Sequence, residues 1–449
     1  MKKKRVLCVC LTAAMLTGLL GGCGSAASTS TTSDAAASTE AGTAATSAAA
    51  ADTQAAESTG DKETVNFWYL WGGDEAKYIE QIIAAYNDSQ DEYEVVGLST
   101  PDQQKVLTGI SGGNGPDITD DFGSDMANYA NENIALALDD YIAKDGIDTS
   151  AFVTGTLDQQ QYDGKTYAFP ISANVFALYY NKDLLKEAGY TDPPKTLEEM
   201  EEMSFKLTKS ENGQLTQLGA PLVPTSYWYN SITFDYGTDY GQVGNLTPDN
   251  EGFRNALTYL HDYVAEFGSD AVNSYVTSGQ SKVNSAQDPF LAGQAAFRID
   301  GTWFYKMAED AGLNFGLELL PAAESQNGQT YSYLDTSCFY IPSTAKNPDG
   351  AWDFLKYITM GDGAKMFITL KKDLPALNSL LDDPDVTSNG DSYSVYLKVL
   401  SESTLKTMPS MLNGSDYATA LSNAVDSVML GGSVDDAIAT AVSASDGLK

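Results

Sequence analysis

Residues 64–71 read Thr-Val-Asn-Phe-Trp-Tyr-Leu-Trp and are followed by Gly72-Gly73. This continuous run of β-branched and aromatic residues is typical of a strand that is buried on both faces. A helix is predicted next, because apolar residues recur at steps of three and four at Tyr78, Ile79, Ile82, Ile83 and Tyr86. Residues 93–98 predict a second strand, so the chain begins with the order strand, helix, strand.

The same alternation continues along the chain. A helix is predicted near residues 102–110 and a short strand at residues 116–119, which together indicate an α/β sheet. Ligands of such sheets bind beyond the carboxyl ends of the strands. Two later helices have clear start signals, namely the capping box of Thr196 and Glu199 and the pair Asn347-Pro348.

The length and the charge of the chain limit its function. The 449 residues exceed what one hydrophobic core usually serves, so we expect two lobes. A formal net charge of −35 repels phosphate groups and argues against nucleic acid as a partner. Cys338 is the only cysteine beyond residue 23 and is expected to be a small core residue. A single histidine, His261, excludes mechanisms that need two, and we expect neither a metal nor a cofactor.

The amino terminus has the pattern of a lipoprotein signal. Basic residues 2–5 precede an apolar run over residues 6–20, and Gly21-Gly22 leads into Cys23. The apolar run is shorter than the roughly 20 residues that a membrane-spanning helix needs. We therefore expect residues 1–22 to be removed and Cys23 to carry two acyl chains, which hold a protein stably at a membrane. The mature chain would be lipid-anchored at the extracytoplasmic face of the cell membrane.

The segment that follows Cys23 has a different composition from the rest. Up to residue 62 it consists almost entirely of Ser, Thr, Ala and other small or polar residues. Such a segment cannot bury enough apolar surface to fold. We interpret residues 23–62 as the lipidated cysteine and a disordered tether that lifts the folded body off the membrane.

Several segments of the body occur in a recognisable order. They are YDGKTYAFP at 162–170, ALYYNKDLL at 177–185 with AG at 188–189 and PPKT at 193–196, FLAGQAAF at 290–297 with GTW at 301–303, and the stretch 347–358. In this order they resemble the extracellular solute-binding proteins of carbohydrate ABC importers, a family that includes the maltose-binding protein. The resemblance covers nearly the whole body from about residue 64 onward.

This resemblance implies a two-lobed α/β fold of the periplasmic-binding-protein type, with a hinge between discontinuous lobes. The implied first lobe holds residues 63–168 and 322–400, the second holds 169–321 and 401–449, and the hinges fall near 169–171, near 319–321 and after Asp373. The protein would act as a monomer that captures a sugar or oligosaccharide and delivers it to the transmembrane subunits of a permease. No covalent chemistry is implied.

Two alternatives stay open at this point. A polyamine or a peptide is a possible solute, and a polyamine would use Asp120 and Asp121 together with aromatic faces. A surface glycan hydrolase would need two carboxylates, but among 61 acidic residues some pair always looks plausible. The G-x-S-x-G pattern at residues 109–113 follows a predicted helix rather than a strand, which argues against a serine hydrolase.

A neutral sugar offers hydroxyl rims and weakly apolar C–H faces, so its site needs aromatic rings and amide or carboxylate groups. Trp71 ends the first predicted strand, and Asp120 and Asp121 follow the third. Asn174 lies just beyond the first implied hinge. The alternatives are a core position for Trp71, a turn for the aspartates, and a cap or turn for Asn174.

Five further residues complete the candidate set. By the resemblance, Trp303 occupies the position of a sugar-stacking tryptophan in many relatives, and Tyr417 lies where relatives contribute another ring. Tyr227 and Trp228 belong to three consecutive aromatics that cannot all face one core, so at least one should reach the ligand. By the same resemblance, Asp335 lies where a strand that crosses between the lobes returns past the ligand cleft. Core or turn positions are the alternatives for these residues.

Overall fold

The structure is a computed structural model that describes residues 62–388 and 391–448. The predicted signal peptide, Cys23 and the predicted tether up to residue 61 lie outside the described residues. Within the described part of the chain, no helix is both long and apolar enough to cross a membrane.

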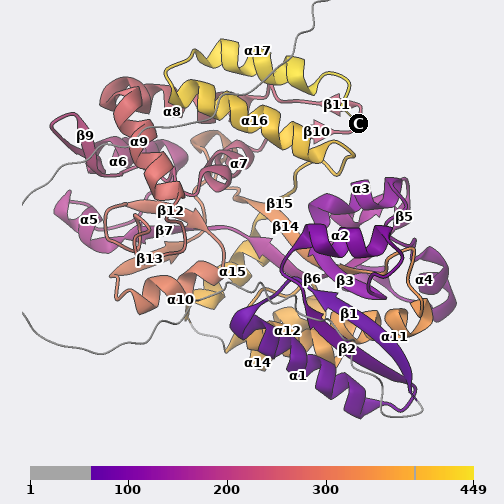
Figure 1. The fold of residues 1–449 in the computed structure, drawn as a ribbon. Coiled ribbons are helices and arrows are strands. Elements are labelled where there is room, and N and C mark those ends of the chain that lie inside the picture. Colours follow the sequence, from indigo (N-terminus) through magenta and orange to yellow (C-terminus); the bar gives the residue numbers. More distant parts are fainter. Residues whose placement is uncertain (1–61, 389–390, 449) are drawn as a thin grey trace, which may run out of the picture. The chain divides into compact units, whose positions relative to one another are not determined.

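The larger sheet of the body is built from six strands (Figure 1). They are β1 (Glu63–Tyr69), β2 (Tyr93–Ser99), β3 (Ile118–Phe122), β6 (Ala168–Val175), β14 (Tyr331–Tyr340) and β15 (Thr404–Lys406). β1 pairs in parallel with β2 and β3, whereas β14 is antiparallel to both β3 and β6. Since β3 and β6 pair with the same residues of β14, β14 lies between them. The predicted α/β sheet is confirmed, with an antiparallel strand inserted from far along the chain.

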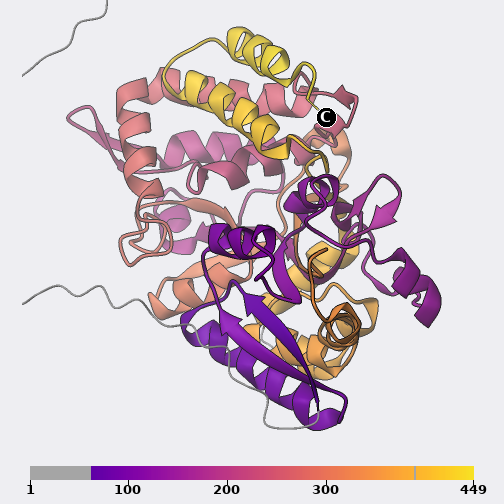
Figure 2. The same ribbon diagram turned by 45° about the vertical axis from the view of Figure 1, so that its right-hand side comes forward.

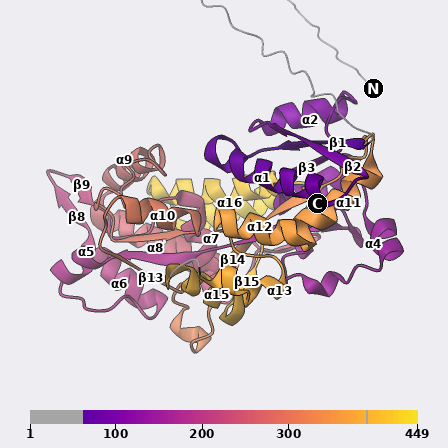
Figure 3. The same ribbon diagram turned by 90° about the horizontal axis from the view of Figure 1, so that it is seen from below.

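Helices cover both faces of this sheet (Figures 1 and 3). On one face lie α1 (Gly73–Ser89), α11 (Pro348–Met360) and α12 (Asp362–Lys371), whose apolar side chains share one core with β1. On the other face lies α2 (Gln103–Ser111), which shares a smaller core with Cys338. Cys338 is fully buried, which confirms its predicted core position.

The first strand differs from its prediction on one face. Val65 and Phe67 are fully buried, but Trp68 on the opposite face is only partly buried. The expectation of a strand buried on both faces is therefore wrong for that face. The short helix α2 packs on this face, with Gly109 so close that a Cβ there would come within 2.8 Å of the Trp68 ring, but it leaves part of Trp68 exposed.

A smaller antiparallel sheet has the order β12 (Phe297–Asp300), β7 (Ala177–Asn181), β13 (Phe315–Glu318). The helices of this part are α5 (Lys182–Glu187), α6 (Leu197–Leu207), α7 (Thr225–Asp235), α8 (Glu251–Phe267), α9 (Ser269–Gln280), α10 (Trp303–Asp310), α16 (Gly414–Met429) and α17 (Val434–Ser445). α16 and α17 pack along α8 although they are far from it in sequence (Figure 2).

The chain passes between the two sheets more than once. Phe176 alone separates β6 from β7, and residues 319–330 connect β13 to β14. The segment after α12 leads to α15 (Asp391–Glu402), which packs against strands of both sheets. The first implied hinge, at 169–171, lies inside β6, whereas the one at 319–321 lies in the open connection after β13. The lobe boundaries themselves stay predictions.

Short hairpins and helices complete the described residues. The hairpin strands are β4 (Gln161–Tyr162), β5 (Lys165–Thr166), β8 (Lys209–Glu211), β9 (Gln214–Gln217), β10 (Gly241–Gln242) and β11 (Asn245–Leu246). The helices are α3 (Met126–Asn131), α4 (Asp139–Asp145), α13 (Asn378–Leu381) and α14 (Pro384–Thr387), with 3-10 turns η1 (Gly123–Asp125), η2 (Thr149–Ala151), η3 (Asp158–Gln160) and η4 (Glu324–Gln326).

Both predicted helix starts are confirmed. The Thr196 side chain accepts a hydrogen bond from the Glu199 amide at 3.2 Å, and the Glu199 carboxylate accepts from the Lys195 amide at 2.7 Å. The Asn347 side chain accepts from the Gly350 amide at 3.0 Å at the start of α11. In the first cap the reciprocal bond reaches one residue further back than in a standard capping box.

Candidate functional site

A pocket of about 340 Å³ lies at the carboxyl ends of β1 and β3. Because the two strands are parallel, these ends meet at the same edge of the sheet. Trp71 lies just beyond β1, and Asp120 and Asp121 belong to β3, so three predicted site residues line one pocket. The lining consists of Leu70, Trp71, Gly72, Glu75, Pro101, Gln103, Asp120, Asp121, Phe122 and Ser337.

Trp71 is held in place from several sides. Its ring centroid lies 5.2 Å from that of Phe367 and 5.8 Å from that of Phe339. The Lys371 ammonium lies 4.7 Å from the Trp71 ring centroid and forms an ion pair with Glu75 at 2.9 Å. Because these neighbours fix the ring, Trp71 is presented to the pocket as a preoriented platform.

The Asp121 carboxylate is almost fully buried and already satisfied within the protein. It accepts hydrogen bonds from Gln103 Nε2 at 2.9 Å, from the Tyr129 hydroxyl at 2.8 Å and from the Phe122 amide at 2.9 Å. Burial raises its pKa, and the hydrogen bonds from Gln103 and Tyr129 oppose that shift. Asp121 therefore orders the pocket wall and keeps little acceptor capacity for a ligand.

Asp120 differs from its neighbour because it accepts one hydrogen bond from another residue, from the Leu70 amide at 2.9 Å. Burial, with a smaller contribution from the charge of Asp121, raises the pKa of Asp120 to about 8. At neutral pH its carboxyl group is thus mostly protonated, so it can donate a hydrogen bond as well as accept one.

Asn174 and Asp335 lie opposite each other on β6 and β14. Successive residues of a strand point to opposite faces, so Asp335 and Ser337 share one face, and both are partly exposed. The Asn174 amide donates to the Ser337 hydroxyl at 3.4 Å, and Ser337 lines the pocket. Burial raises the pKa of Asp335 to about 6. Asn174 thus contacts the pocket lining at Ser337, and Asp335 lies two residues away on the same strand face, although neither lines the pocket itself.

Trp303 and Tyr227 form a second group with Phe176, the residue between β6 and β7. Their rings meet edge to face, with centroids 6.4 Å apart for Tyr227 and Trp303 and 5.9 Å apart for Phe176 and Trp303. Phe176 in turn stacks on Tyr333 at 5.2 Å. Trp303 and Tyr227 are both partly exposed, so each keeps ring surface that a ligand can contact.

The structure places Trp228 and Tyr417 in the core rather than at a site. Trp228 has no exposed surface, which leaves Tyr227 as the partly exposed member of the aromatic run. Tyr417 is 1% exposed, and its hydroxyl donates to the Tyr240 carbonyl at 3.0 Å. Tyr417 begins the buried stripe of α16 that continues at Leu421 and Ala424, a helical spacing that indicated a core position. We correct both residues to core positions.

Seven of the ten residues that line the pocket were not predicted as site residues from the sequence, among them Gln103 and Ser337. Gln103 lies in the first turn of α2 and contacts Asp121, and nothing in the local pattern marks it. Ser337 had a usable signal, because it lies two residues from Asp335 and therefore on the same face of a strand.

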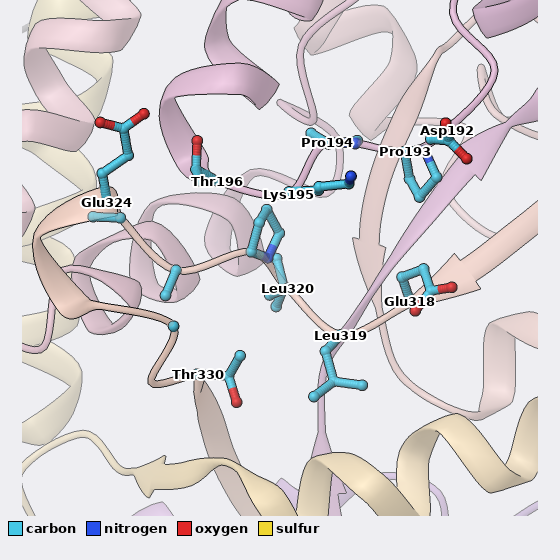
Figure 4. A pocket seen from close by; sticks show the side chains of 14 residues that line it. Asp192, Pro193, Pro194, Lys195, Thr196, Glu318, Leu319, Leu320, Glu324 and Thr330 are labelled. Atoms are coloured by element: carbon cyan, nitrogen blue, oxygen red, sulfur yellow. The ribbon is translucent and has the colours of Figure 1, made fainter.

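A larger cavity, of about 590 Å³, lies elsewhere and is shown in Figure 4. It is flanked by residues 192–196 and by the connection after β13, including Leu319 and Leu320. No aromatic ring lines it, and it includes none of the predicted site residues. The smaller pocket at Trp71 is therefore the better candidate for a ligand with ring faces.

Among residues 62–388 and 391–448, no group of three or more His, Cys, Asp or Glu side chains is arranged to hold a metal ion. Asp120 and Asp121 of the pocket are bound to protein amides and a hydroxyl, and Glu75 forms an ion pair with Lys371.

The sequence and fold together define the class of protein. The family of bacterial extracellular solute-binding proteins matches residues 81–392, and the chain belongs to this family. Its fold is the two-domain periplasmic-binding-protein fold, since the described body superposes on solved members of that class.

Three relatives illustrate the similarity. The maltotriose-binding protein of Pyrococcus abyssi (strain GE5 / Orsay) is 25% identical over 348 residues, which are 75% of this chain and 71% of that protein. The galactooligosaccharide-binding protein of Bacillus subtilis (strain 168) is 26% identical over 279 residues, 61% of this chain and 63% of that protein. The structure of CpMnBP1 with mannobiose bound has a TM-score of 0.71 and 24% identity, and covers 86% of this chain and all of that one. The first two are named as binding proteins, and the third structure has mannobiose bound.

Proposed function

We propose that the protein captures a sugar or oligosaccharide outside the cytoplasm and delivers it to the permease of an ABC importer. The observation that carries the proposal is the pocket where Trp71, a fixed aromatic platform, adjoins the carboxyl groups of Asp120 and Asp121. A flat ring suits the C–H face of a sugar, and the Asp120 carboxyl group, which can donate as well as accept a hydrogen bond, suits a sugar hydroxyl. The names of the maltotriose- and galactooligosaccharide-binding relatives support the same ligand class.

The proposed site has two halves. Trp71, Asp120, Asn174 and Asp335 form a polar half on the larger sheet, with Asp121 ordering its wall. Trp303 and Tyr227 form an aromatic half beside the smaller sheet. In the proposed mechanism the lobes close about hinges between the two sheets, because only the closed form contacts the solute from both sides. The solute is bound and released unchanged, and the importer's ATPase supplies the energy.

The proposal includes the lipid anchor and a monomeric state. Residues 1–22 act as the signal, Cys23 carries the lipid, and residues up to 62 form the tether. Replacing Cys23 by Ser should abolish incorporation of labelled palmitate. Labelling of the Cys23→Ser variant at the wild-type level would reject the anchor without affecting the binding proposal.

The decisive experiment is a thermal-shift screen of the full chain with maltotriose, mannobiose and a galactooligosaccharide. A ligand that binds only the native state stabilises it by about 2.7 kcal/mol at a concentration of 100 Kd. Spermidine serves as the probe for a cationic solute, because the pocket carries acidic groups. A shift with spermidine and with none of the sugars would overturn the carbohydrate assignment.

The best sugar should then be titrated against two variants. Trp71→Ala should weaken binding about tenfold, which corresponds to about 1.4 kcal/mol. Tyr141→Ala is the control, since this ring lies on α4, a helix with no fully buried residue. Equal affinities of the wild type and Trp71→Ala would remove Trp71 from the site.

A further inference from the structure

A buried charged triad lies in the smaller sheet. Arg298 of β12 is 1% exposed, and its guanidinium nitrogens lie 2.6 Å from Asp288 and 2.5 Å from Asp300, which are also buried. The Asn284 side chain accepts a further hydrogen bond from Arg298 at 3.3 Å. Burying charges costs free energy, and apolar replacements of a buried ion pair are often neutral or stabilising. The triad therefore calls for a role beyond stability.

The triad is attached to the turn that follows β12. The Asp300 carboxylate accepts from the Gly301 amide at 2.8 Å. The Tyr396 hydroxyl donates to the Asp300 carbonyl at 3.0 Å, and the Tyr179 hydroxyl donates to the Gly301 carbonyl at 2.9 Å. Each backbone polar group from the Asp300 carbonyl to the Gly301 carbonyl is thus fixed by a buried partner.

This turn carries the Trp303 ring. A Cβ at Gly301 would lie 2.2 Å from two carbons of the Trp303 ring, so the ring rests directly on the turn. Phe304 follows Trp303 directly in the chain, and the Arg298 guanidinium carbon lies 3.7 Å from the ring centroid of Phe304. Arg298 therefore contacts the chain immediately after Trp303 and, through Asp300, orders the chain before it.

We propose that the Asp288–Arg298–Asp300 triad is a positioning device that sets the direction of the Trp303 ring. Arg298 is a positioning residue, because it acts on the turn and on Phe304 and not on the solute. The consequence for sugar affinity rests on the function proposed above. The orientation of Trp303 does not, and it can be measured without any ligand.

The test is ¹⁹F NMR of the full chain labelled with 5-fluorotryptophan. The chain has five tryptophans, and Trp303→Phe identifies the Trp303 resonance by its loss. Arg298→Met should shift that resonance by more than its line width or broaden it, while the resonances of Trp68, Trp71 and Trp352 stay in place. Gly301→Ala should also shift or broaden the Trp303 resonance, because the added methyl group displaces the ring while the side chains of the triad stay unchanged.

Arg254→Met is the matched control, because it removes the same side chain from an exposed ion pair on α8. It should leave all five resonances unchanged. If Arg298→Met does not fold, Tyr396→Phe provides the second variant, since it removes the hydroxyl that contacts both the Asp300 carbonyl and the Tyr179 hydroxyl. An unchanged Trp303 resonance in folded Arg298→Met, or in both Tyr396→Phe and Gly301→Ala, would overturn the proposal. Equal shifts of all five resonances would also overturn it.

Affinity measurements separate this inference from the proposed function. Arg298→Met should weaken the best sugar of the screen about tenfold, and Arg254→Met should leave its affinity unchanged. If the wild-type chain binds no sugar, the proposed function fails while the NMR result still decides the role of Arg298. If the Trp303 resonance moves but sugar affinity is retained, Trp303 is positioned by the triad but is not part of the site.

Discussion

The Nζ atom of Lys371 lies 4.7 Å from the centroid of the Trp71 ring. This contact joins the end of α12 to the segment after β1, although the two are distant in sequence. Lys371 also pairs with Glu75 and lies 3.6 Å from Asp373, so it links the pocket rim to the chain that leaves the larger sheet.

Replacement of Lys371 by Met should loosen Trp71. The cation–π contact and the partly buried ion pair are lost together, and we expect stability to fall by about 1–2 kcal/mol. Affinity for the best sugar should fall several-fold, as measured by calorimetric titration. Lys365→Met on the same helix removes ion pairs to Asp383 and Asp385 that contact neither Trp71 nor the pocket, and it should leave the sugar affinity unchanged. Identical effects of the two variants would contradict a specific role for Lys371.

Stability should fall as the pH rises from about 4 to 8. Burial raises the pKa of Asp120 to about 8, and the pKa values of Asp125 and Asp335 to about 6, above the ordinary value of 3.8. The folded state therefore binds more protons than the unfolded state in this range, and this stabilisation is lost as the pH rises through the folded pKa values.

Asp120→Asn should flatten this pH dependence and raise stability near pH 8 by on the order of a few kcal/mol. Urea denaturation at pH 5 and pH 8.5 measures the difference. Asp91→Asn, at an exposed position, should leave the slope unchanged. A wild-type protein that is more stable at pH 8.5 than at pH 5 would contradict the assignment.

Asp117→Ala should be strongly destabilising. The buried Asp117 carboxylate accepts from the Asn66 backbone amide at 2.8 Å and from the Lys346 and Asn347 amides at 2.7 and 2.9 Å. It thereby ties β1 to the start of α11, and its loss leaves several partly buried donors without partners. We expect a decrease of about 3 kcal/mol or more in the free energy of unfolding. A loss below about 1 kcal/mol in a denaturation curve would be inconsistent with this contact.

Trp228→Phe should separate a core position from a binding position. The residue has no exposed surface, so the smaller ring should leave a void and lower stability by about 1–3 kcal/mol. The affinity for sugar should stay within twofold of the wild type, in contrast to Trp71→Ala. A large loss of affinity in a stable Trp228→Phe protein would return Trp228 to the candidate site.

The amino-acid sequence by itself determined the local elements and the family. A continuous apolar run placed β1 and apolar periodicity placed α1. The side chains of Thr196 and Asn347 marked helix starts, and the ordered segments from 162 to 358 indicated a solute-binding protein. These properties depend on residues that are close together in the chain, so a local pattern can carry them. Trp71, Asp120 and Asp121 were found because parallel strands end at a common edge.

The tertiary structure alone decided which distant residues meet. β14 lies between β3 and β6 through backbone hydrogen bonds that any residue other than proline can make, so no local pattern specifies that partner. This pairing brings Ser337 to the pocket and places Asn174 opposite Asp335. The burial of Trp228 and Tyr417 was decided in the same way, because a ring is a core residue or a binding surface according to what packs against it.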